Sequence, residues 1–374
     1  MSATAAPIVS PEDQRVTFVE LFFDLVFVFC VTQVVHLMHG HVDVASAGSA
    51  LLVFWLVWWA WTQFTWALNA ANTDHPRVQV ITLLATAIAF FLAVGIPGAL
   101  TDDPLWFAGP YVAVRAVGLL LYYWVAWTDP AQRRAVRVFS LFSLSGLVMV
   151  LVGAVFGGAA LFWCWAATVV LDLLAAGVGG QLEGWNLHPE HFAERHGLIV
   201  IIALGETLIV AAGGLAGAAR TPTVLVTGAT AVLMISALWW TYFPYAKPAC
   251  EHAIAKRHGN ARSRMARDVY SVIHFPMLCG IIAVAVALEV SLAHPDEPMA
   301  ASVRAALGVG TLLFVGGTAV AIWRSTGRVL VWRWAIGVAA AVLAVLVSAA
   351  PWVSVLLMFL MLGAVVMTER SQFA

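Results

Sequence analysis

Long apolar stretches alternate with short polar breaks from one end of the chain to the other. An α-helix crosses the hydrocarbon core of a bilayer with about 20 apolar residues, so each stretch of this length predicts one membrane-spanning helix. We therefore predict an all-α fold, a polytopic membrane helix bundle of about twelve transmembrane helices. The predicted spans cover residues 18–38, 44–68, 77–98, 105–127, 132–154, 157–178, 195–215, 222–245, 267–292, 300–323, 329–348 and 350–368.

The composition supports this class. Of the 374 residues, 62% are hydrophobic and only 10% are charged, whereas soluble domains carry about 25% charged residues. A net charge of −1 gives no field that would attract nucleic acid, and the four cysteines show neither a disulfide framework nor metal-ligand spacing. We expect the lipid bilayer and an unidentified small molecule or ion as partners, and no nucleic acid, metal or cofactor. The chain has no P-loop, which excludes an ATP-driven pump.

The distribution of basic residues predicts an orientation. If the N-terminus is cytoplasmic, sixteen of the nineteen lysines and arginines fall on the cytoplasmic side, Arg220 and Arg304 fall outside, and Arg115 falls within a span. Because positive residues gather on the cytoplasmic side, we expect both termini there. Six bases lie between residues 247 and 267, where they could bind an anionic lipid head group or only reflect this general bias.

Weak internal similarity suggests a duplicated half. Trp58-Trp59 in the second predicted span matches Trp239-Trp240 in the eighth. Six is an even number, so a duplicated set of six helices would form a parallel repeat. Chance similarity among helices rich in Leu, Val, Ala and Trp explains the same match, and both interpretations stay open. The predicted parts are a cytoplasmic tail 1–16, a first six-helix half 17–178, a cytoplasmic linker 179–194 and a second six-helix half 195–370.

Acidic residues inside the predicted spans are candidates for function. Glu20 and Asp24 lie one helical turn apart in the first span, where each costs about 2.5–3.5 kcal/mol at the membrane centre and the two repel each other. Asp172 and Glu206 also lie within spans, and Arg115 is the cation predicted at depth. One arginine does not neutralise four acids, so we expect these five residues to include an ion- or proton-binding site. The alternative is one structural ion pair, with another acid protonated.

The start of the seventh predicted span supplies supporting candidates. His191, Glu194 and Arg195 lie close together there, and Arg195 shares a helical stripe with Glu206. Their spacing matches no recognised zinc motif, so a solvated helix start is a better interpretation than a metal site. His274, in the ninth span, is either a buried proton-responsive group or a histidine that packs between helices.

Five tryptophans lie in the second predicted span, mostly at mid-depth. They could line a cavity for a flat or isoprenoid-like ligand, or bind a cation on a ring face, but we expect them to face lipid. They are Trp55, Trp58, Trp59, Trp61 and Trp66.

Three stretches of the sequence, residues 20–28, 191–206 and 270–280, resemble the low temperature requirement protein A family of bacterial membrane proteins. The resemblance spans nearly the whole chain. It implies a protein of the bacterial inner membrane, in a family associated with growth in the cold. It supplies no reaction, substrate or catalytic residue.

Two functions fit these observations. The first is a secondary transporter coupled to protons or ions, in which Glu206 and Asp24 bind the coupling ion and Arg115 pairs with one of them. The second is an intramembrane enzyme that acts on a lipid or isoprenoid, with Glu20, Asp24 and Glu206 as general acid or base. The sequence has no aspartate-rich diphosphate motif, nucleophile elbow or HExxH, so it favours the transporter. A non-catalytic scaffold ranks last.

Overall fold

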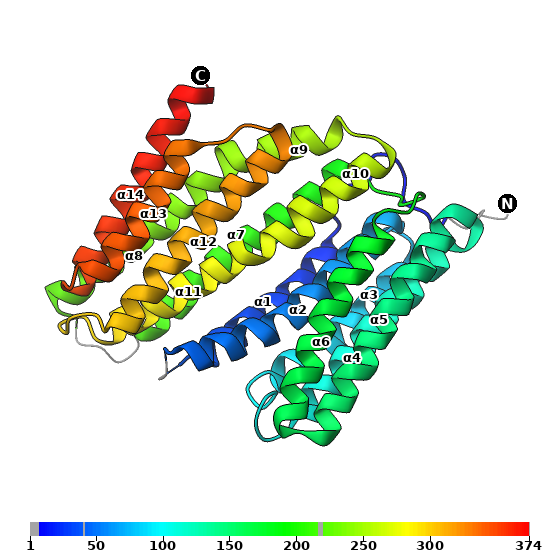
Figure 1. Ribbon diagram of the computed structural model, residues 1–374, viewed down its shortest axis with the longest axis horizontal. Coiled ribbons are helices and arrows are strands. Elements are labelled where there is room, and N and C mark those ends of the chain that lie inside the picture. The colour runs from blue at the N-terminus through cyan, green and yellow to red at the C-terminus, as the bar shows by residue number, and fades with distance from the viewer. Residues whose placement is uncertain (1–6, 40–41, 216–219, 374) are drawn as a thin grey trace. The chain divides into compact units, whose positions relative to one another are not determined.

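The computed structural model describes residues 7–39, 42–215 and 220–373, the last four of these as backbone only (Figure 1). Residues 1–6 of the predicted cytoplasmic tail and the side chain of Arg370 lie outside this description. The elements in chain order are α1 (Phe18–His36), α2 (Val44–Ala70), α3 (Pro76–Gly95), α4 (Pro104–Val125), η1 (Ala126–Thr128), α5 (Pro130–Phe156), α6 (Gly158–Gly179), α7 (Pro189–Gly214), α8 (Pro222–Thr241), η2 (Tyr242–Ala246), α9 (Lys247–Ala255), α10 (Gly259–Met265), η3 (Ala266–Ile273), α11 (His274–Ala293), α12 (Ala301–Thr326), α13 (Val331–Leu346) and α14 (Pro351–Phe373).

The prediction of a polytopic helical bundle is confirmed. Eleven helical stretches of the described chain are long and apolar enough to cross a membrane, with Pro222–Ala255 and Gly259–Ala293 counted as one stretch each. The eleventh predicted span, at residues 329–348, is the shorter apolar helix α13 of 16 residues. The β pairing among the described residues is an isolated bridge between Val9 and Ala71.

Proline and glycine set the helix boundaries. Helices α3, α4, α5 and α8 each have proline in the first turn, where the missing N–H leaves no intrahelical bond unmade. The side chains of Asp129 and Thr221 accept hydrogen bonds from backbone N–H groups at the starts of α5 and α8. Gly157 and Gly158 join α5 to α6 with φ angles of 65° and 53°, a conformation that glycine adopts without strain.

The chain forms two compact units. The first contains Met1–Val34, Ser49–Arg195 and Ile254–Arg267, and the second contains the remaining segments. In the first unit, α3, α4, α5 and α6 pack in sequence, each against the next (Figure 1). In the second unit, α11, α12, α13 and α14 pack in the same way, and α8 packs on α14. The parallel repeat of two six-helix halves stays a prediction.

Helix α7 begins earlier than the predicted span 195–215. It starts at Pro189, so His191 and Arg195 lie within its first two turns. Two π-helical segments, η2 and η3, also interrupt the predicted spans 222–245 and 267–292. The apolar pattern did not indicate them, because hydropathy reports the length of a span and not its hydrogen-bond register.

Candidate functional site

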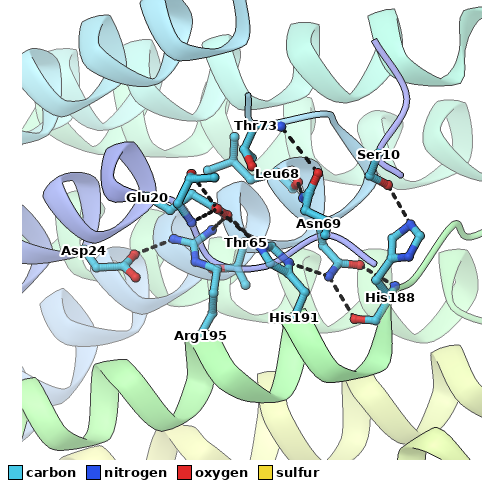
Figure 2. A network of polar contacts seen from close by, with 12 residues as sticks. Ser10, Glu20, Asp24, Thr65, Leu68, Asn69, Thr73, His188, His191 and Arg195 are labelled. Carbon is cyan, nitrogen blue, oxygen red and sulfur yellow. Dashed lines mark hydrogen bonds and ion pairs between the residues drawn. The ribbon is translucent and has the colours of Figure 1, made fainter. Parts of the chain in front are cut away.

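The guanidinium of Arg195 lies between two buried carboxylates of α1 (Figure 2). It donates a hydrogen bond through Nη2 to Asp24 Oδ1, and its Nη1 lies 3.4 Å from Glu20 Oε1. The side chains of Glu20, Asp24, His191 and Arg195 are fully buried in the first unit. We call these four residues the acidic cluster. Two carboxylates here share one guanidinium, so the charges of the cluster do not pair one to one.

Glu20 has several donors besides Arg195. Its Oε2 accepts hydrogen bonds from the backbone N–H of Thr17 at 3.0 Å and from the Thr17 hydroxyl at 2.9 Å. A glutamate three residues after the N-cap commonly accepts from the N-cap N–H, and a negative charge is favourable at a helix N-terminus. His191 Nε2 lies 3.2 Å from the same oxygen and 3.1 Å from Oε1. The helix start and His191 therefore stabilise the charge of Glu20.

Asp24 has fewer partners. Its Oδ1 accepts from Arg195 and from the indole N–H of Trp61 at 2.7 Å. Its Oδ2 is buried and has no hydrogen-bond partner among the described residues. A buried carboxylate oxygen is costly unless a donor, a proton or a cation meets it. Glu20 Oε1 also has no hydrogen-bond partner among the described residues, but His191 Nε2 and Arg195 Nη1 lie 3.1 and 3.4 Å from it. Oδ2 of Asp24 is therefore the oxygen of the cluster most suited to receive a proton.

Polar contacts continue from the cluster to the segment before α7 (Figure 2). His191 Nδ1 lies 2.9 Å from the side-chain nitrogen of Asn69, at the end of α2. Asn69 also bonds both the backbone N–H and the carbonyl of His188, at 2.8 and 3.0 Å. His188 Nε2 in turn lies 2.6 Å from the hydroxyl of Ser10. Residues from the N-terminal segment, α2 and α7 are thereby joined to the two acids of α1.

A second buried pair joins α4 to α6 in the same unit. Arg115 Nη2 donates to Asp172 Oδ1 at 3.0 Å, and both side chains are fully buried. Arg115 Nη1 also donates to the Tyr111 hydroxyl at 2.6 Å, and Nε donates to Gln63 Oε1. This pair is one-to-one, with neutral groups completing the coordination of the guanidinium. The charges of Arg115 and Asp172 therefore balance each other within the pair.

These contacts correct two sequence-based expectations. Arg115 pairs with Asp172, so the expectation that it pairs with Asp24 or Glu206 is wrong. Arg115 is also not the one buried cation, because Arg195 and Arg333 are buried as well. Arg333 contacts Glu369 and donates to the Thr241 carbonyl in the second unit.

A sequence signal for the acidic cluster was present. His191 and Arg195 are four residues apart, as are Glu20 and Asp24, so each pair lies on one helix face. Glu20 faces His191 and Asp24 faces Arg195. An i, i+4 pair of acids and an i, i+4 pair of hydrogen-bond donors predict such a contact between two helices.

The structure places the other candidates elsewhere. Glu194 is exposed, and Glu206 is half-buried on the part of α7 that belongs to the second unit. His274, also in the second unit, is buried. Its Nδ1 lies 2.8 Å from the Val269 carbonyl and its Nε2 lies 2.9 Å from the Tyr242 hydroxyl. Within the described residues, no group of three or more His, Cys, Asp or Glu side chains could hold a metal ion.

The expectation that the tryptophans of α2 face lipid is wrong for four of the five. Trp55, Trp58, Trp59 and Trp61 are buried, and Trp66 is half-buried. Trp55 stacks on Trp59 and Trp58 stacks on Trp61, with ring centroids 5.1 and 4.9 Å apart. Trp61 also lies under the Arg195 guanidinium, 5.7 Å from ring centroid to Cζ. These rings pack the interior of the first unit and adjoin the acidic cluster.

Comparison with known proteins defines the family. The sequence profile of the bacterial low temperature requirement A protein (LtrA) family matches residues 15–367, nearly the whole chain. The chain belongs to the LtrA family. A relative from Rhizobium meliloti (strain 1021), named uncharacterized protein RA0937, is 28% identical over 344 residues, which are 87% of this chain and 81% of the relative. No solved structure matches the chain. With its many apolar helices, this LtrA protein is a multi-pass membrane protein of a bacterial family.

The assignment of Arg115 and Asp172 as a structural pair predicts a specific pattern of stabilities. Arg115→Met or Asp172→Leu alone should destabilise the LtrA protein by about 3–5 kcal/mol, because each leaves one buried charge unpaired. The double variant should recover most of this loss, because neither charge remains. Unfolding of the purified protein in detergent measures both effects. Additive losses in the double variant would contradict the pairing.

The burial of His188 predicts that the folded protein loses stability in mild acid. His188 lies outside the membrane-spanning segments. Burial lowers the pKa of His188 below its ordinary value of about 6.5, although the Glu12 carbonyl, which accepts a hydrogen bond from it, acts in the opposite direction. The unfolded chain then binds the proton more readily than the folded chain. The contribution of His188 to stability is therefore complete above about pH 6.5 and declines as the pH falls from there towards the lowered pKa.

The test compares thermal unfolding of the wild type and of His188→Gln between neutral and mildly acidic pH. The wild type should lose stability more steeply than the variant on acidification. His252→Gln, at an exposed position of α9, is the matched control and should follow the wild type. Parallel curves for the wild type and His188→Gln would contradict the prediction.

Proposed function

We propose that this LtrA protein is a proton-coupled secondary transporter in which Asp24 binds the coupling proton. The supporting observation is that one buried arginine serves two buried carboxylates, while Asp24 Oδ2 has no hydrogen-bond partner among the described residues. Ionisable groups inside membrane helices commonly mark ion pathways and proton relays. A proton fits this position, because Asp24 offers a single unbonded oxygen and metal cations require several oxygen ligands.

Protonation of Asp24 would redistribute the contacts of Arg195. A neutral Asp24 attracts the guanidinium less, and Arg195 Nη1 already lies 3.4 Å from Glu20 Oε1. Arg195 would then move towards Glu20, one helical turn away along α1. Helix α7 is continuous from Pro189 to Gly214 and also carries Glu206, so a shift of its first turns would reach that residue. A local change in charge would in this way bias the position of a helix, as a coupled transporter requires.

We further propose that the protein lies in the cytoplasmic membrane of a bacterium with both termini on the cytoplasmic side. The pairing of Glu20 with His191 and of Asp24 with Arg195 means that α1 and the start of α7 run in the same direction. Parallel helices require an even number of crossings between their starts, which agrees with the six predicted spans before α7. The bias of basic residues then puts the acidic cluster near the cytoplasmic side.

Transport in proteoliposomes tests this function. Vesicles that contain the purified protein and an internal pH-sensitive dye are exposed to pools of amino acids, sugars, nucleosides and organic cations. We expect one class of solute to cause a proton flux, and an imposed pH gradient to drive its accumulation. Asp24→Asn should reduce this accumulation about tenfold or more, because an amide neither gains nor loses a net proton near neutral pH.

Glu289→Gln is the matched control. Glu289 is also a carboxylate of a membrane helix, but its side chain is paired with His39 in the second unit. This variant should keep transport near the wild-type rate. Accumulation driven by the pH gradient in correctly folded Asp24→Asn would contradict the role of Asp24.

A further inference from the structure

We propose that Asn69 fixes His191 as a neutral imidazole with its proton on Nε2, so that the acidic cluster has one negative charge in excess and takes up a single proton. The uptake step rests on the function proposed above. The assignment of the His191 proton rests on geometry alone and stands independently of transport.

The backbone of His188 fixes the orientation of the Asn69 amide. The N–H of His188 donates to Asn69 Oδ1 at 2.8 Å, and only an oxygen accepts there. The carbonyl of His188 accepts from Asn69 Nδ2 at 3.0 Å. The backbone N–H only donates and the carbonyl only accepts, so these two bonds identify Oδ1 and Nδ2 of Asn69.

The orientation of Asn69 determines the tautomer of His191. Asn69 Nδ2 carries two hydrogens, of which one is directed to the His188 carbonyl and the other to His191 Nδ1, 2.9 Å away. An amide nitrogen donates and does not accept, so His191 Nδ1 accepts and carries no proton. The ring proton is then on Nε2, which faces both oxygens of Glu20 at 3.1 and 3.2 Å. An imidazolium would bring two N–H groups against each other at Nδ1.

The charge of the cluster follows from this tautomer. His191 contacts Glu20 on α1 and Asn69 on α2. Arg195, one turn along α7, lies beside the same carboxylate of Glu20. Two carboxylates, one guanidinium and a neutral imidazole sum to a charge of −1. One proton neutralises the cluster, whereas a second would leave a buried positive charge. If His191 were instead an imidazolium, the cluster would already be neutral and would have no electrostatic reason to bind a proton.

Nitrogen NMR of the full-length protein tests this assignment. The protein is labelled with ¹⁵N at its histidines, and His191→Gln assigns the resonances of His191. In the wild type, the ¹⁵N shifts of His191 should be those of the neutral Nε2–H tautomer, with Nδ1 unprotonated. His274 is the internal reference, because its Nδ1 faces the Val269 carbonyl and should carry the proton in every variant.

Two variants of Asn69 test separately how the hydrogen bond to His191 Nδ1 and the charge beside it determine the protonation of His191. Asn69→Asp replaces the donor with an acceptor, so His191 should become doubly protonated. The added negative and positive charges cancel, and the need for one proton at Asp24 should persist. Asn69→Leu removes the hydrogen bond at similar size, and His191 should populate both neutral tautomers.

An imidazolium or an Nδ1–H tautomer of His191 in the wild type would overturn the inference. The wild-type spectrum tests the tautomer even if a variant of Asn69 does not fold. Failure of this inference is distinguishable from failure of the proposed function. If His191 is the Nε2–H tautomer while Asp24→Asn keeps gradient-driven transport, the function is wrong and the assignment of Asn69 holds. If His191 is charged while transport depends on Asp24, the inference alone is wrong.

Discussion

The guanidinium of Arg195, buried between Glu20 and Asp24, is the interaction on which the polar interior of the first unit depends. Two carboxylates in an apolar helix are unfavourable without a counter-charge, and truncating a partner of a buried ion pair costs about 3–5 kcal/mol. Arg195 brings the first turns of α7 against α1. The same arrangement lets His191 meet Glu20 and Asn69, which connects the acids to the end of α2.

The two buried arginine sites of this unit differ in a way that suggests different roles. Arg115 has one carboxylate, Asp172, and two neutral acceptors, so its charge is balanced within the site. Arg195 has two carboxylates, Glu20 and Asp24, so its single charge does not balance the charges of its site. The balanced site holds α4 against α6. The site of Arg195, with two carboxylates, is electrostatically suited to bind a further positive charge. The alternative of an intramembrane enzyme stays a prediction.

Most of the fold could be predicted from the sequence, because span length and helix boundaries are local properties. Apolar stretches of about 20 residues located the helices, and the break between the predicted spans 132–154 and 157–178 located the turn between α5 and α6. The acids of the cluster could also be identified, because charges in apolar stretches are conspicuous. The contact of Arg195 with these acids was not predicted, since the polar run before Arg195 resembles a solvated helix start. The burial of Arg195 depends on a tertiary contact with α1, which a count of residues along one helix does not contain.

The central claim is that Asp24 exchanges a proton while Arg195 serves both carboxylates. The most direct measurement is the number of protons that the purified, unbuffered protein binds as the pH is lowered, compared between the wild type and folded Asp24→Asn. The account predicts that the wild type binds one proton more per chain. Identical proton-binding curves would show that Asp24 does not change its protonation state, and would contradict the account.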